Sequence, residues 1–305
     1  MLMLWIIFSL IVAVVYSLSA FVDNYTVDVI LLRKRPQCIK VLHGYCYLII
    51  GIIGLIFFGI GNYTPLEIGL IAASGVCAAL SSIPYYFGLK SEDTTSTAIF
   101  LQLSPVLFLI AEAFLFHQSI EPLQYIAFFI ILAAPIVIVL SRRRKSSRKL
   151  EYRAIGFFLL FVLFYTIASL IFSRAAKPTA AFSAYSIYLI GRGCFDTTTT
   201  CIVKSWRRDF VLTWQRKKGQ ILTFCLTNVL VYTAGEFLFR YSTTIAPASL
   251  VSVTVNACEL IFTFIFGLIL SRIWPKFGRE KLAKHIIIAH LVATVLAVIG
   301  IIILN

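Results

Sequence analysis

Residues 154–173 read AIGFFLLFVLFYTIASLIFS, an uncharged run of 20 residues. A helix of this length spans about 30 Å, which is the thickness of the hydrocarbon core of a bilayer. Strands of a membrane barrel would be about ten residues long and would alternate in polarity, whereas this run is continuously apolar. The stretch therefore predicts a transmembrane α-helix.

Similar runs recur along the chain of 305 residues, which is 60% hydrophobic and only 13% charged. So few charged side chains cannot cover the surface of a globule in water, which excludes a soluble protein. We expect an all-α integral membrane protein with ten transmembrane helices. The ten predicted spans are residues 3–22, 43–60, 66–88, 96–116, 122–141, 155–173, 181–203, 220–239, 245–270 and 285–304.

The basic residues indicate how such a bundle is oriented. Of the 27 Lys and Arg residues, 23 fall in the loops that follow the first, third, fifth, seventh and ninth spans. Loops rich in Lys and Arg stay in the cytoplasm, so both termini are predicted to be extracytoplasmic in a multi-pass protein of the cell membrane. The formal net charge of +14 is then an orientation signal that faces anionic lipids, and it does not indicate nucleic acid as a partner.

The chain also divides into two similar halves. A basic linker at residues 142–153 separates residues 1–141 from residues 154–305. At an offset of 151 residues, YFGLKS at 86–91 lies over FLFRYS at 237–242, and the apolar runs that follow also correspond. Each half holds five predicted spans, an odd number, so the two repeats must be inverted relative to each other, as in many secondary transporters.

Motifs within these halves resemble a known family. The aromatic-Leu-Lys-Ser sequence precedes a Ser/Thr-rich turn, and QLSP at 102–105 and FLFHQ at 114–118 follow. This order is similar to the repeat unit of EamA-like transporters of the drug/metabolite transporter (DMT) superfamily, over nearly the whole chain. The resemblance implies a fold of ten helices in two repeats, which moves small metabolites by alternating access, usually as export.

Charged residues inside the spans are the first candidates for a site, because a charge at the bilayer centre costs roughly 3 kcal/mol or more. Arg192 lies in the middle of the seventh span between two glycines, and Asp196 follows one turn later on the same helix face. Arg192 is a candidate for binding a substrate carboxylate or phosphate. The alternative is an internal Arg192–Asp196 ion pair that only permits burial. The glycines permit either an unwound helix or close helix packing.

Three glutamates complete the charged candidates. Glu236 and Arg240 are one turn apart in the eighth span, and interfacial pairing is favoured over a coupling role for Glu236. Glu259 has no basic residue within reach on its own helix. Proton coupling is slightly favoured for it over a neutral hydrogen-bonded role or a pair with Arg192 across the bundle. Glu112, near the outer end of the fourth span, is expected to be interfacial.

We expect a substrate cavity between the repeats, lined by the first, third, fourth, sixth, eighth and ninth spans. Aromatic walls with few polar groups suit an amphipathic or aromatic solute. Together with Arg192 and Asp196, the predicted binding residues are Gln102, Ser104, Asn256, Tyr16, Tyr165, Tyr86 and Tyr232.

These features predict a secondary active transporter of a small organic solute such as an amino acid or a drug-like compound. The alternatives are a flippase for a lipid-linked precursor and, less favoured, a membrane-embedded lipid-modifying enzyme. The sequence has no GxxxxGK[ST], HExxH or CxxC motif, so we expect no enzyme activity, no cofactor and no metal site. The expected partners are the solute, membrane lipids and a coupling ion such as the proton, in a monomer or homodimer.

Overall fold

The computed structural model describes residues 2–31, 36–91, 103–116, 121–123, 125–130, 133, 137, 152–273 and 284–304. Every regular element in this part of the chain is a helix, and none is a strand. The prediction of an all-α fold is thereby confirmed. Half of the predicted fifth span, most of the basic linker and the predicted binding residue Gln102 lie outside the described residues.

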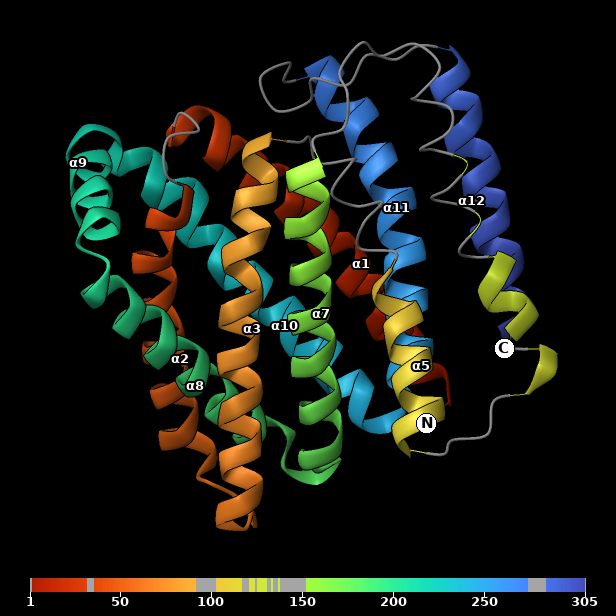
Figure 1. Ribbon diagram of the computed structural model, residues 1–305, viewed down its shortest axis with the longest axis horizontal. Coiled ribbons are helices and arrows are strands. Elements are labelled where there is room, and N and C mark those ends of the chain that lie inside the picture. Colours follow the sequence, from red (N-terminus) through yellow and green to blue (C-terminus); the bar gives the residue numbers. More distant parts are fainter. Residues whose placement is uncertain are drawn as a thin grey trace.

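Figure 1 shows the helices as a bundle in which α3, α7 and α5 run alongside one another, while α8 and α10 cross it obliquely. The helices are α1 (Leu2–Tyr25), α2 (Lys40–Phe58), α3 (Pro65–Ser91), α5 (Ser104–Phe116), α7 (Tyr152–Ala175), α8 (Ala181–Ile202), α9 (Lys204–Gln220), α10 (Thr227–Ile245), α11 (Ala248–Ile273) and α12 (Lys284–Leu304). Short helical turns add η1 (Thr26–Ile30), η2 (Pro36–Ile39), η3 (Pro178–Ala180) and η4 (Ile221–Leu226).

Within the described residues, six segments are long and apolar enough to cross a membrane, by length and composition. They are Leu4–Ile30, Gln37–Phe58, Pro65–Leu89, Gly156–Ala175, Lys204–Ile245 and Ala248–Leu270. The helix at Ser104–Phe114 is apolar but shorter. α8 is less apolar, because it carries Arg192, Asp196 and the four threonines at 197–200. The arrangement of ten spans in two repeats stays a prediction.

Two segments differ from the predicted spans. The first predicted span ends at residue 22, whereas α1 extends to Tyr25 and continues as a π-helical turn to Ile30. Asp23 therefore belongs to the helix and lies within the bundle. The predicted loop after the seventh span forms α9, whose residues Trp206, Phe210 and Trp214 pack against a buried cluster. This segment is helical because aromatic residues recur at every fourth position and bury one face of it.

The helices of the two halves pack tightly against each other. α1 contacts α10 and α11, α7 contacts α3 and α5, and α8 lies against α2 and α3. A Cβ atom added to Gly191 would lie 2.2 Å from the backbone oxygen of Ala72, and one added to Gly75 would lie 2.1 Å from that of Tyr188. The glycines beside Arg192 therefore permit close packing, and α8 continues through them without unwinding.

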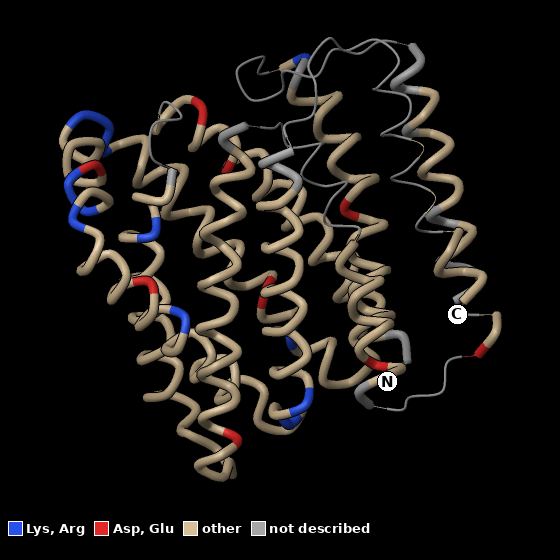
Figure 2. The backbone as a smooth tube through the Cα atoms, viewed as in Figure 1, with Lys and Arg blue, Asp and Glu red and all other residues tan. Residues whose placement is uncertain are grey.

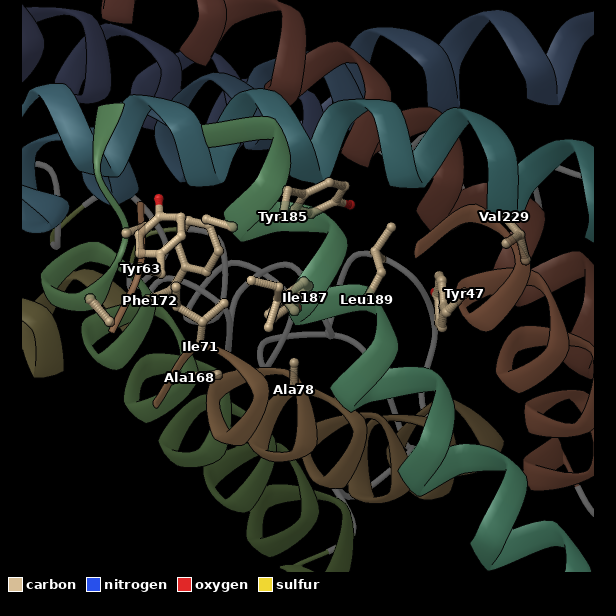
Figure 3. Close-up of a cluster of buried hydrophobic side chains, with 14 residues drawn as sticks. Tyr47, Tyr63, Ile71, Ala78, Ala168, Phe172, Tyr185, Ile187, Leu189 and Val229 are labelled. Atoms are coloured by element: carbon tan, nitrogen blue, oxygen red, sulfur yellow. The ribbon is translucent and has the colours of Figure 1, made fainter. Parts of the chain in front are cut away.

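A hydrophobic core holds α8 in place (Figure 3). Ile71 of α3, Ala168 of α7 and Tyr188 of α8 are fully buried in it. The ring of Phe172 meets that of Tyr188 edge-on, with 5.6 Å between the ring centres. This packing fixes the position of the helix that carries Arg192.

The two ends of the bundle differ in charge. α9 lies at the end where α1 and α3 end and where α2 and α10 begin (Figure 1). We call this the basic end, because α9 brings a cluster of Lys and Arg to it (Figure 2). The basic residues of α9 are Lys204, Arg207, Arg208, Arg216, Lys217 and Lys218. The α2–α3 and α7–α8 connections lie at the opposite end.

Candidate functional site

A cavity of about 110 Å³ lies between the two halves of the chain. It has room for several water molecules or a small solute. Side chains from α1, α2, α3, α5, α7, α8, α10 and α11 line it. In α1 and α2 these side chains belong to the half of the helix nearer the basic end, and in α3 and α10 they extend from the middle of the helix toward that end.

The cavity brings together nine of the residues predicted for the site. They are Arg192, Ser104, Asn256, Tyr16, Tyr165, Tyr86, Tyr232, Glu236 and Glu259. Asp196 is not among the lining residues, and Gln102 lies outside the described part of the chain. α2 adds His43 and Tyr47, which the sequence did not indicate because the second span was not expected to face the cavity.

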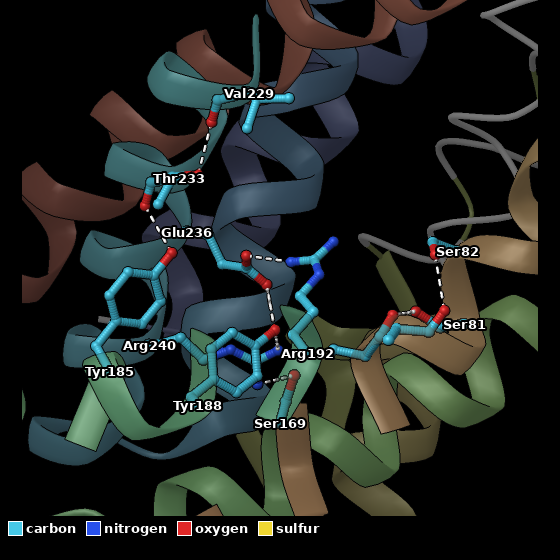
Figure 4. A network of polar contacts seen from close by, with 12 residues as sticks. Ser81, Ser82, Ser169, Tyr185, Tyr188, Arg192, Val229, Thr233, Glu236 and Arg240 are labelled. Carbon is cyan, nitrogen blue, oxygen red and sulfur yellow. Dashed lines mark hydrogen bonds and ion pairs between the residues drawn. The ribbon is translucent and has the colours of Figure 1, made fainter. Parts of the chain in front are cut away.

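Glu236 is the centre of a buried polar network (Figure 4). Its Oε2 accepts a hydrogen bond from Arg192 Nη1, and its Oε1 accepts one from the hydroxyl of Tyr188, both at 2.5 Å. Arg240 Nη2 lies 3.5 Å from Glu236 Oε1 and donates to the Tyr188 hydroxyl at 3.0 Å. Arg240 Nη1 donates to the hydroxyl of Ser169 at 2.8 Å. One carboxylate thus holds the guanidinium groups of two helices together.

The predicted ion pair between Arg192 and Asp196 is wrong, since Arg192 pairs with Glu236 of α10. The spacing of four residues allows a pair on one helix, but the long Arg side chain reaches the neighbouring helix instead. Its guanidinium carbon also lies 4.4 Å from the ring centre of Tyr47 and 5.7 Å from that of Tyr232. Arg192 is therefore both charge-paired and covered by aromatic rings at the edge of the cavity.

Asp196 pairs with Lys40 at the start of α2, with 2.5 Å between Nζ and Oδ1. Their side chains are 1% and 0% exposed. Lys40 also donates to the backbone oxygen of Ala79 at 2.8 Å and to the hydroxyl of Ser82 at 2.5 Å. This pair joins α8 to α2 and α3. Lys40 was counted among the basic residues of a predicted loop, but it lies in the interior of the bundle.

Three side chains that were expected at the membrane–water interface are buried instead. Arg240 and Glu236 are both 0% exposed, because this turn of α10 faces the bundle interior. Glu112 accepts hydrogen bonds from the backbone N–H groups of Ala248 at 2.8 Å and Ser249 at 3.3 Å. Its carboxylate caps the first turn of α11, where a negative charge interacts favourably with the helix dipole. The position of a residue near a helix end does not reveal which neighbour it faces.

Two carboxylates in the cavity have no basic partner among the described residues. Glu259 of α11 is 5% exposed, and no described side chain pairs with its carboxylate, so the alternative pair with Arg192 is wrong. Asp23 of α1 lies just beyond the predicted first span. It accepts hydrogen bonds from the Tyr85 hydroxyl at 3.2 Å and from Asn228 Nδ2 at 3.0 Å. Both of these donors are neutral.

Aromatic rings form one wall of the cavity. A row of neighbouring rings, with centres 5.3, 5.2 and 5.8 Å apart, is formed by Tyr86, Tyr85, Phe161 and Tyr165. Tyr16 of α1 stacks on Tyr232 of α10 at 5.3 Å. The wall gives the cavity apolar surface with π-electron faces and only a few polar groups, which suits an aromatic or amphipathic solute.

At the end opposite the basic end, polar contacts join the α2–α3 connection to the α7–α8 connection. Lys177 Nζ lies 2.8 Å from Glu67 Oε1 and donates to the backbone oxygen of Asn62 at 2.9 Å. The backbone N–H of Lys177 donates to the hydroxyl of Tyr63 at 2.9 Å. We call Asn62, Tyr63, Glu67 and Lys177 the clasp. It ties the two halves together on the side away from the cavity.

Among the described residues, no group of three or more His, Cys, Asp or Glu side chains is arranged to hold a metal ion. The seven cysteines are free thiols, and none of them lines the cavity.

No protein-family model matches the chain, and no curated protein matches it in sequence. Its fold is similar to that of a solved structure described only as "Crystal structure of protein", with a TM-score of 0.64. The similarity covers 98% of this chain and 94% of the other chain. The two are 14% identical, so the likeness concerns the fold alone. Nearly the whole chain therefore adopts an architecture that is known from a solved structure.

Proposed function

We propose that the chain is an EamA-like secondary transporter that exports a small organic solute across the cell membrane by alternating access. The observation that carries the proposal is the cavity, where charged, aromatic and other polar side chains of eight helices converge inside an apolar bundle. Ionisable groups are costly within a membrane, and they mark solute or ion pathways there. The aromatic wall and the few polar groups suit a small amphipathic solute.

The contacts between helices support a pair of inverted repeats. α1, the first helix of the first half, packs on α10 and α11 of the second half. α7, the first helix of the second half, packs on α3 and α5 of the first half. In the proposed repeats, α3 and α10 are the third helices and α5 and α11 the fourth, so exchanging the halves interchanges these two sets of contacts. Inverted repeats have this relation, with the binding site at their interface.

The positions of the cavity and the clasp support alternating access. The cavity lies nearer the basic end, and the clasp closes the opposite end. The positive-inside rule assigns the basic end to the cytoplasm, which leaves both termini extracytoplasmic. In this proposal the structure is the state that faces the cytoplasm. Opening of the clasp, together with closure of the basic end, gives the state that faces outward.

The proposal is tested by solute efflux from proteoliposomes that contain the full-length protein and are loaded with a small-molecule cell extract. We expect at least one solute to leave faster than from protein-free liposomes, with a rate that depends on an imposed pH gradient. Replacing Glu259 with glutamine is expected to remove this dependence on pH, because an amide cannot take up and release a proton. Mass spectrometry of the external solution measures both effects.

Glu112→Gln is the matched control, because Glu112 is also a buried carboxylate of the membrane region but caps α11 outside the cavity. Its efflux should keep the pH dependence of the wild-type protein. Efflux from Glu259→Gln that still follows the pH gradient would remove Glu259 as the coupling group. If no solute leaves faster through the wild-type protein than through the lipid alone, the transport function is wrong.

A further inference from the structure

We infer that the cavity binds an organic cation, a positively charged nitrogen joined to an aromatic or apolar group. The inference rests on the proposed transport function and specifies its substrate class. Four side chains that line the cavity are ordinarily charged at neutral pH, and two of them, Arg192 and Glu236, pair with each other. Asp23 and Glu259 remain, and both are negative when ionised.

Asp23 is held in the cavity by neutral groups. Its two carboxylate oxygens accept one hydrogen bond each, from the Tyr85 hydroxyl at 3.2 Å and from Asn228 Nδ2 at 3.0 Å. No described Lys or Arg forms an ion pair with it. These contacts orient the carboxylate. Arg192 interacts electrostatically with Asp23 but pairs with Glu236, so no ion pair among the described residues neutralises the charge of Asp23.

Glu259 is the second carboxylate without a counterion. It is 5% exposed, it lines the cavity, and no hydrogen bond or ion pair from a described side chain reaches its carboxylate. Glu259 and Asp23 both line this cavity, and so does Tyr85, which donates to Asp23. A buried carboxylate without a partner is unfavourable unless a cation or a proton binds to it.

The aromatic wall adds a second reason to expect a cation. The row from Tyr86 through Tyr85 and Phe161 to Tyr165 lines the cavity, and the face of an aromatic ring attracts a cationic nitrogen within about 6 Å of its centre. His43, the remaining titratable group of the lining apart from the tyrosines, packs its ring 5.8 Å from Tyr47. Carboxylates beside a row of aromatic rings are the kind of groups that bind organic ammonium ions.

Arg192 is less suited to bind the solute as an anion site. Its Nη1 is hydrogen-bonded to Glu236, and the Tyr47 ring lies against its guanidinium group. An anionic solute would have to displace Glu236, which also accepts a hydrogen bond from Tyr188. The unpaired charges in this cavity are negative, so a cation is the favoured solute.

The inference is tested with three probes of similar shape and different charge: benzyltrimethylammonium, 2-phenylethanol and phenylacetate. Their binding to the full-length protein in nanodiscs is measured by isothermal titration calorimetry. We expect the cation to bind most tightly. We expect Glu259→Gln and Asp23→Asn each to weaken its binding by roughly 10–100-fold, as for the loss of one pair of opposite charges in a binding site. Glu112→Gln, which changes a carboxylate outside the cavity, should leave binding unchanged.

Glu259→Asp keeps the charge and should retain most of the binding, so it distinguishes loss of charge from loss of folding. Tighter binding of phenylacetate than of the cation would overturn the inference in favour of an anion site at Arg192. Cation binding that survives both Glu259→Gln and Asp23→Asn would also overturn it. The efflux experiment with cell extract distinguishes the two proposals. If only anionic or neutral solutes leave, the cation site is refuted and the transport function stands. If the cation binds but no solute leaves, the transport function is refuted.

Discussion

Replacing Glu236 with glutamine is expected to lower the free energy of unfolding by roughly 3–5 kcal/mol and to abolish transport. The substitution removes the only carboxylate that pairs with Arg192 and Arg240 among the described residues. Both guanidinium groups are almost completely buried. In the variant they would stay charged, and neither water nor a carboxylate at position 236 would compensate that charge. Unfolding of the purified protein by increasing amounts of SDS measures the loss of stability, and efflux from proteoliposomes measures transport.

Glu67→Gln is the matched control for stability, because it makes the same change in an ion pair that contacts solvent. The side chains of Lys177 and Glu67 are 44% and 26% exposed, and ion pairs of this kind contribute little to stability. We therefore expect a much smaller shift for Glu67→Gln than for Glu236→Gln. Equal stability of Glu236→Gln and the wild-type protein would show that the network around Glu236 does not hold α8 and α10 together.

Locking the clasp is expected to stop transport almost completely. Lys177 lies 2.8 Å from Glu67, and the two residues belong to connections from different halves of the chain. If the halves separate here in each cycle, a short bifunctional thiol crosslinker between Glu67→Cys and Lys177→Cys holds them in the present state. The seven native cysteines are replaced first, so that only the introduced pair reacts.

The controls for the clasp are the two single cysteine variants treated with the same reagent. Each should transport as well after treatment as before it, since a single thiol cannot bridge the connections. Cleavage of a reducible crosslinker should restore transport by the double variant. Full transport by the crosslinked protein would mean that this end of the bundle stays closed throughout the cycle.

The sequence predicts which residues reach the interior better than it predicts their partners. Arg192 and Glu259 are recognisable because a charge within an apolar run needs an interior environment, and both line the cavity, as does Glu236, which was expected at the interface. Their partners are not recognisable in this way, because spacing along one helix reports only neighbours on that helix. Asp196 pairs with Lys40, 156 positions away along the chain and on another helix.

Hydropathy also places the ends of spans poorly where polar residues face a cavity. The predicted first span ends at residue 22 because polar residues follow, yet the helix continues and places Asp23 in the lining. A helical period was the available signal: Tyr16, Ser19, Ala20 and Asp23 fall on one face of α1, and all four line the cavity. In the same way, the sequence predicts a loop where α9 lies, because the basic residues of this segment conceal the spacing of its aromatic residues.

Alternating access requires the cavity to open to each side of the membrane in turn. Ser81 lines it, and Ser81→Cys in a protein without the seven native cysteines makes this position reactive to a charged thiol reagent that cannot cross the bilayer. We expect labelling in both right-side-out and inside-out vesicles, and we expect the clasp crosslink to prevent labelling from the side of the clasp only. Labelling from one side alone without the crosslink, or labelling from both sides with it, would contradict alternating access.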